Sequence, residues 1–193
     1  MQPIDKPWEQ LRKAESFIEK MAIAKTLDEY EEHWKDFLHN LERACNKLIS
    51  HLKKSPKYQG WVERGRTEKL RKQDQLLSYL INARGAEEHS ISDITKQQPG
   101  GIGINPATGN SLHINKLEIN NGQIHIDSNQ PIKIDFIPGK VELLPIKNRG
   151  RSYSVPNTHL GKHIKNSDPV KIATLGIEFY RSYFEMAEKH FVK

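Results

Sequence analysis

The feature that most constrains the fold is a long amphipathic segment, residues 27–52. Its apolar side chains recur every three or four residues over about seven turns, which is the period of an α-helix and not of a strand. Thr26 precedes the segment and Glu29 follows three residues later, the spacing of a capping box. A helix with one apolar face needs other helices to cover it. The stripe consists of Leu27, Tyr30, Trp34, Phe37, Leu38, Leu41, Cys45, Leu48, Ile49 and Leu52.

Three further segments repeat this period. Residues 7–24 begin with Pro7, which suits the first position of a helix. A third helix is predicted from near Thr67 through residue 90, and the last begins after Asp168, with a proline in its first turn. We therefore predict a mainly α protein in which the whole chain, 1–193, forms an up-and-down four-helix bundle.

Between the third and last helices the period changes to two. Residues 112–119 and 123–126 flank an Asn-Asn-Gly turn, which predicts a hairpin. Residues 132–137 and 141–146 add two short strands, and the Gly- and Pro-rich stretch before the hairpin is predicted to be a loop. We expect residues 95–150 to be a small insertion, made of a loop and an antiparallel β-meander, before the last helix.

Cysteine content and hydropathy exclude several classes of protein. The single cysteine, Cys45, excludes an intramolecular disulfide framework and a thiolate zinc cluster. Because Cys45 lies on the apolar stripe, we expect an inert buried thiol in a reducing, cytoplasmic setting. No apolar run approaches the ~20 residues of a membrane span, and the N-terminus lacks the apolar core of a signal peptide. No carboxylate or thiol lies at a metal-ligand spacing from His113 or His125, so we expect no metal. We also expect no cofactor.

The charge is uneven along the chain. The formal net charge is +6, with nine Lys and Arg against two Glu in residues 47–72 and six against one Glu in residues 140–165. Two interpretations stay open: a solvated face, or a surface that binds RNA phosphates. Tyr58 and Trp61, within the first stretch, would stack on bases or pack under a loop. The candidate nucleic-acid-binding residues are Lys53, Lys54, Arg64, Arg66, Arg71 and Lys72.

The end of the third predicted helix carries a chemical motif, Arg84-Gly85-Ala86-Glu87-Glu88-His89. An Arg and a His separated by four residues, after an apolar helix, resemble the R-x(4–6)-H signature of the HEPN superfamily (higher eukaryotes and prokaryotes nucleotide-binding). The stretches LLSYLINARGAEEHSI and SVPNTHLGKHI look like uncharacterised bacterial proteins with a similar helix. The resemblance implies a helical bundle, an RNA partner and a homodimer. Many members are metal-independent endoribonucleases, and others are non-catalytic binding modules.

The resemblance implies that Arg84 and His89 are catalytic. RNA supplies its own nucleophile, the 2′-OH beside the scissile phosphate. His89 would accept that proton or donate one to the leaving 5′-oxygen. Arg84 would hold the phosphate and stabilise the charge that develops on its oxygens. The product would end in a 2′,3′-cyclic phosphate, with no metal required.

Other features favour a non-catalytic RNA-binding or protein-interaction module. Gly85 stands where the superfamily usually has a polar residue. Arg84 and His89 are separated by about 140° around an ideal helix, while Glu88 lies one turn from Arg84 and would pair with it. His159 is a second candidate, either near the site or as the anchor of a loop. A third interpretation is that the β insertion carries the specificity, because its short, alternating strands have an open edge that would pair with a second subunit.

Overall fold

The computed structural model describes residues 4–89 and 93–192 and divides the chain into two compact units. The helical unit comprises residues 1–97 and 141–193, and the β unit comprises residues 98–140. No helix in the described ranges is long and apolar enough to cross a membrane.

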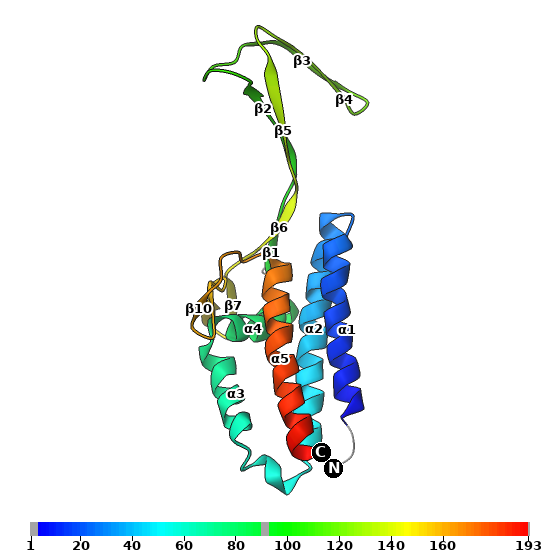
Figure 1. Cartoon of the computed structure of the whole chain (residues 1–193), viewed down its shortest axis with the longest axis vertical. Helices are drawn as coiled ribbons and strands as arrows, with labels where there is room; N and C mark the ends of the chain where they lie inside the picture. Colours follow the sequence, from blue (N-terminus) through cyan, green and yellow to red (C-terminus); the bar gives the residue numbers. More distant parts are fainter. Residues whose placement is uncertain (1–3, 90–92, 193) are drawn as a thin grey trace. The chain divides into compact units, whose positions relative to one another are not determined.

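Three long helices of the helical unit lie side by side (Figure 1): α1 (Asp5–Ile23), α2 (Leu27–Leu52) and α5 (Pro169–Phe191). The predicted starts of α2 and α5 are confirmed. The Thr26 hydroxyl accepts a hydrogen bond from the Glu29 amide (3.1 Å), and the Glu29 carboxylate accepts one from the Lys25 amide (2.8 Å). The Asp168 carboxylate accepts hydrogen bonds from the amides of Val170 and Lys171, which caps α5.

The third predicted helix is two helices, α3 (Val62–Gln73) and α4 (Gln75–His89), after a 3₁₀ turn, Pro56–Tyr58. Asp74 separates them, because its backbone is extended (φ −73°, ψ 130°). The break lets α4 run crosswise to the long helices and pack on α2 and α5 (Figure 1). The helical character is confirmed, but the helices do not form the clean up-and-down bundle that the sequence predicted.

The core is built from the apolar stripes of α1, α2, α4 and α5. Trp34 is fully buried and stacks on Phe37, with ring centroids 5.6 Å apart. Helices α4 and α5 approach closely at Gly176, where a Cβ atom would stand 2.5 Å from a methyl group of Leu80. Cys45 is buried, as predicted, and its burial raises the pKa of the thiol.

Three short strand pairs complete the helical unit. Strands β1 (Thr95–Gln98) and β6 (Lys140–Leu143) pair where the chain enters and leaves the β unit. The two others are tight hairpins, β7–β8 and β9–β10, whose two-residue turns are Arg149-Gly150 and Leu160-Gly161. All four turn residues have positive φ, the conformation of the turns that match the twist of paired strands. These hairpins comprise β7 (Ile146–Asn148), β8 (Arg151–Tyr153), β9 (Thr158–His159) and β10 (Lys162–His163).

The β unit contains two ribbons, and their pairing differs from the predicted meander. Strands β3 (Ile114–Asn120) and β4 (Gln123–Ser128) form the hairpin predicted around the Asn-Asn-Gly turn. Strand β5 (Ile132–Ile137) pairs instead with β2 (Gly101–Pro106), inside the stretch predicted as a loop. Glycine weakens the interior of a strand, so the glycines of β2 favoured the loop prediction, although Ile102 and Ile104 alternate with small or polar residues.

Truncation of Trp34 tests the core. We expect Trp34→Ala to lower the free energy of unfolding by about 3–5 kcal/mol, because a large, fully buried ring is replaced by a cavity. Chemical denaturation followed by circular dichroism measures this loss. Ile23→Ala is the control, because Ile23 is 78% exposed and its truncation should change stability by about 0.5 kcal/mol or less. Equal losses in both variants would contradict the central place of Trp34 in the core.

Candidate functional site

Arg84, the predicted catalytic arginine, lies between α4 and α2. Its guanidinium Nη1 is 2.6 Å from a carboxylate oxygen of Glu42, and about a quarter of each side chain is exposed. The ion pair joins residues 42 positions apart in the chain, and no local sequence pattern indicates it. The side chain of Glu88, the predicted partner of Arg84, lies outside the described residues. At this distance the carboxylate fixes the direction of the guanidinium and offsets part of its charge.

A pocket of about 360 Å³ surrounds this ion pair. Helix α2 contributes most of its wall through side chains three or four positions apart, which share one face of the helix. Three side chains are cationic, Arg43, Lys47 and Arg84, and Glu42 is the one carboxylate among the described lining residues. The lining, which we call the α2–α4 pocket, is His39, Glu42, Arg43, Asn46, Lys47, Ser50 and Arg84.

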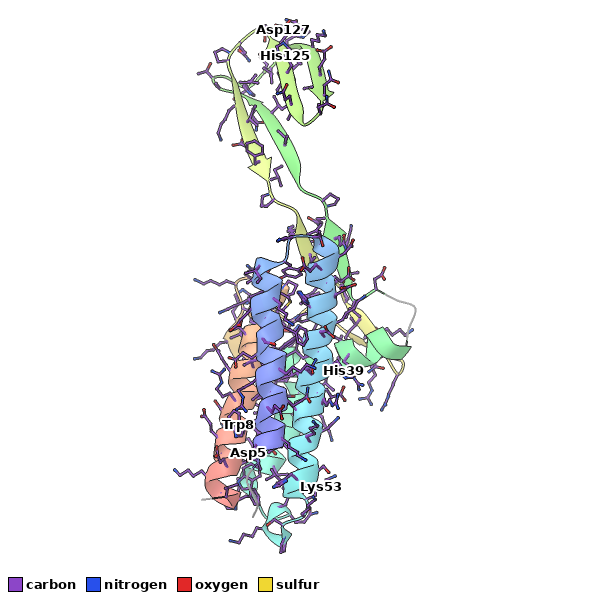
Figure 2. The ribbon with its side chains drawn as sticks, turned by 90° about the vertical axis from the view of Figure 1, so that its right-hand side faces the viewer. Asp5, Trp8, His39, Lys53, His125 and Asp127 are labelled. Atoms are coloured by element: carbon purple, nitrogen blue, oxygen red, sulfur yellow. The ribbon has the colours of Figure 1, made fainter. Side chains whose placement is uncertain are left out.

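The histidine that the structure places in this pocket is His39, on the exposed side of α2 (Figure 2). The predicted catalytic histidine, His89, is the last residue of α4, and its side chain lies outside the described residues. His39 was not among the residues predicted from the sequence. The available signal was the spacing of His39, Arg43 and Lys47 at four-residue intervals on the polar side of a long amphipathic helix.

Gly85 lies against Asn148, which belongs to β7. A Cβ atom at position 85 would stand 2.6 Å from the Asn148 amide nitrogen, closer than real Cβ contacts. That amide group donates a hydrogen bond to the Asn82 side-chain oxygen (3.0 Å), and the Asn82 amide donates to the Ser78 carbonyl (2.7 Å). The space that a larger side chain at position 85 would fill therefore holds a hydrogen-bonded amide from another part of the chain.

The predicted nucleic-acid-binding residues differ in exposure and in ion pairing. Arg64 is hydrogen-bonded to Glu68 (3.0 Å), and Arg66 is 3.7 Å from Glu63. Lys53, Lys54 and Lys72 are exposed. Tyr58 and Trp61 are buried, and Trp61 stacks on Tyr183 with centroids 5.3 Å apart. Of the two predictions for Tyr58 and Trp61, stacking on bases or packing within the protein, the structure shows packing.

Arg71 is the most enclosed of these cations. Its guanidinium carbon lies 6.0 Å from the centre of the Tyr180 ring. Burial disfavours its charge, but Tyr180, Cys45 and Glu42 close by leave the pKa of Arg71 raised. Arg71 and Lys72 also line a pocket of about 440 Å³ with Arg151, so the structure brings together the two basic stretches of the sequence there.

His159 anchors a loop. Its ring Nδ1 is 2.9 Å from Asp74 Oδ1, and the pair is buried. Asp74 also accepts hydrogen bonds from the Leu77 amide (3.0 Å), at the start of α4, and from the Leu160 amide (2.7 Å), in the β9–β10 turn. The His159 and Phe179 rings pack in a T-shaped arrangement, with centroids 6.1 Å apart. His159 also lines a pocket of about 410 Å³, whose described lining does not include Arg84.

No group of three or more His, Cys, Asp and Glu side chains in residues 4–86 and 93–192 is arranged to hold a metal ion.

Comparison of the chain with protein-family models, with curated proteins and with solved structures found no match.

The contacts of Asp74 predict that removing this helix cap costs more stability than removing the cap at Asp168. Asp168→Ala removes one helix cap and should cost about 1 kcal/mol of folding free energy. Asp74→Ala removes a cap and also leaves the His159 ring and the Leu160 amide without their acceptor, so we expect a loss at least about 1 kcal/mol larger. Denaturation measures both losses, and hydrogen exchange should report reduced protection of the Leu160 amide in Asp74→Ala. Equal losses would show that Asp74 is an ordinary cap.

The contact between Gly85 and Asn148 predicts coupling between the two positions. Gly85→Ala should destabilise the protein because its methyl group meets the Asn148 amide, and truncation at Asn148 should relieve that clash. A double-mutant cycle of Gly85→Ala and Asn148→Ala should show a favourable coupling of about 0.5–3 kcal/mol. Additive effects would mean that the two residues do not touch.

Proposed function

We propose that this protein is a HEPN-like, non-catalytic RNA-binding module that binds RNA phosphates in the α2–α4 pocket. The observation that carries the proposal is the lining of that pocket, which contains Arg43, Lys47, Arg84 and His39 and a single described carboxylate. The Lys47 ammonium also donates a hydrogen bond to the Gln10 side chain of α1 (3.2 Å). The proposal includes a homodimer, as the family resemblance implies.

The chemistry of the pocket suits a phosphate. Arg side chains bind phosphate oxygens through paired N–H groups, and Lys adds a compact charge. Asn46 and Ser50 add neutral hydrogen-bonding groups. Glu42 holds Arg84 in place before RNA binds, which reduces the conformational entropy lost on binding. RNA binding of this type releases counterions and weakens as salt rises.

The distribution of charge also supports RNA binding by the helical unit, which contains the α2–α4 pocket. The β unit contains three lysines and three acidic residues, so the whole excess of +6 belongs to the helical unit. Arg71, Lys72 and Arg151 provide a second basic pocket on that unit.

The surroundings of Gly85 also support the HEPN-like part of the proposal. The superfamily usually has a polar side chain directly after the arginine, and this chain has glycine. The Asn148 amide of β7 occupies the space next to Gly85, so a polar group stands beside the position that directly follows Arg84 without being attached to α4.

One observation favours RNA cleavage as a second candidate function. His39 and Arg84 line one pocket, so an imidazole and a guanidinium would both reach a bound phosphate group. The imidazole of His39 or of His89 would move the proton of the 2′-OH, and Arg84 would stabilise the phosphate. Binding is the leading proposal, because phosphate binding needs only the cations that line the pocket, whereas cleavage also needs a histidine placed within reach of the 2′-OH.

Charge reversal in the pocket tests RNA binding. We expect Arg43→Glu to weaken binding of a short mixed-sequence single-stranded RNA about tenfold or more. The slope of log K against log salt should fall by about 0.7 for each phosphate that the variant no longer neutralises. Fluorescence anisotropy at several salt concentrations measures both quantities.

The matched control is Arg12→Glu on α1, where the arginine is exposed and does not line the α2–α4 pocket. Both variants change the net charge equally, so a general electrostatic attraction would be reduced equally. Equal weakening in Arg12→Glu and Arg43→Glu, or no RNA binding by the unaltered protein, would overturn the proposed function.

Incubation with RNA in EDTA separates binding from cleavage. If the module only binds, the unaltered protein, His39→Ala and His89→Ala should all leave the RNA at the same background level of cleavage. Cleavage by the unaltered protein with 2′,3′-cyclic phosphate ends, lost in either histidine variant, would replace the binding proposal by the second candidate.

A further inference from the structure

Both ribbons of the β unit have one apolar and one polar face. On β2–β5, the cross-strand pairs Ile102–Phe136, Ile104–Ile134 and Pro106–Ile132 share one side. On β3–β4, Leu117–Ile126 and Ile119–Ile124 do the same, whereas His125 and Asp127 of β4 (Figure 2) belong to the polar side. Exposure is high for several of these side chains, 78% for Phe136 and 67% for Ile119.

Ribbons of this kind need further contacts. An isolated two-stranded hairpin is at best marginally stable in water, and an independent sheet needs three or more strands with an apolar face. Each ribbon of the β unit is a two-stranded sheet. Large exposed apolar surfaces of this kind mark interaction sites.

The charged residues of β5 are arranged so that the strand can pair with a second copy of itself. Lys133 and Asp135 stand two positions apart on the polar face, one before and one after Ile134 in the sequence, and form an ion pair within the strand (2.8 Å). When two identical strands pair antiparallel about Ile134, each Lys133 lies opposite the Asp135 of the other copy. The same register sets Ile134 opposite Ile134 and Ile132 opposite Phe136, which are favourable apolar cross-strand pairs. The sequence of β5 is therefore complementary to itself in this register.

The edges of β2 and β3 are less suited to this pairing. Strand β2 carries glycine and asparagine between its apolar residues and has no charged side chain. Strand β3 has a similar alternation, Lys116 and Glu118, but its register shifts between Ile114 and Lys116. Such irregularities interrupt pairing at an edge. The ladder of β5 is regular over all six residues.

We propose that two copies of this chain associate through the outer edges of β5, antiparallel and centred on Ile134, to form a four-stranded sheet in the order β2–β5–β5–β2. The equal numbers of lysines and acidic residues in the β unit mean that two copies do not repel each other there. An isologous pairing of this type closes after two copies. The proposal does not depend on RNA binding.

Charge exchange at positions 133 and 135 tests the pairing in the full chain. The unaltered protein should form a dimer by analytical ultracentrifugation. Lys133→Asp and Asp135→Lys each place like charges opposite one another twice, so each should weaken self-association about tenfold or more. The double variant K133D/D135K restores opposite charges and should dimerise again. A mixture of the two single variants should form the heterodimer.

Disulfide trapping tests the register. Directly opposite residues of antiparallel strands have Cα atoms about 4.5–5.5 Å apart, within the span of a disulfide. Ile134→Cys should therefore cross-link two copies on mild oxidation. Ile104→Cys should not, because β2 of one copy and β2 of the other are three strand spacings apart, about 14 Å. The native Cys45 is buried in the helical unit and does not interfere.

Three results would overturn the proposal: an unaltered protein that stays monomeric at every concentration tested, failure of the double variant to recover dimerisation, or equal cross-linking of Ile104→Cys and Ile134→Cys. A dimer that is insensitive to all these changes would place the interface elsewhere in the chain.

Discussion

The carboxylate of Asp74 is the constraint on which the arrangement of the helical unit depends. It stands between α3 and α4 and accepts hydrogen bonds from the first turn of α4, from the Leu160 amide and from the His159 ring. Next to it, the Gln75 side chain accepts hydrogen bonds from the amides of Asn157 and Thr158. Two neighbouring residues therefore start a helix and fix a loop that lies far along the chain. Buried polar groups require such complete pairing, because an unmet carboxylate would cost more than the contacts contribute.

The direction of α4 follows from that junction, and the α2–α4 pocket follows from the direction of α4. If α3 and α4 were one straight helix, Arg84 would not meet Glu42. The exposed cations of α2 would then form an ordinary solvated helix face. The pocket arises because a crosswise helix brings a guanidinium to the polar side of α2.

The local elements of this chain were predictable, and the long-range contacts were not. The helix caps at Thr26 and Asp168 and the Asn-Asn-Gly turn each depend on a few adjacent residues, so the sequence alone predicts them. The break at Asp74 is concealed because apolar residues continue on both sides of it, from Leu70 to Leu76. The partner of β5 lies in an earlier, glycine-rich stretch whose strand period is weak. The ion pair of Arg84 with Glu42, and the pocket that Arg84 and His39 both line, depend on helix packing that no local pattern encodes.

The pairing of β1 with β6 has an evolutionary consequence. The β unit enters and leaves through two strands that are hydrogen-bonded to each other, so its two ends are held side by side by the helical unit itself. An insertion with adjacent ends can be lengthened, shortened or exchanged without altering the core that surrounds it. The same helical unit can thus accept different inserted elements at this one point, while the residues that line its basic pockets change independently.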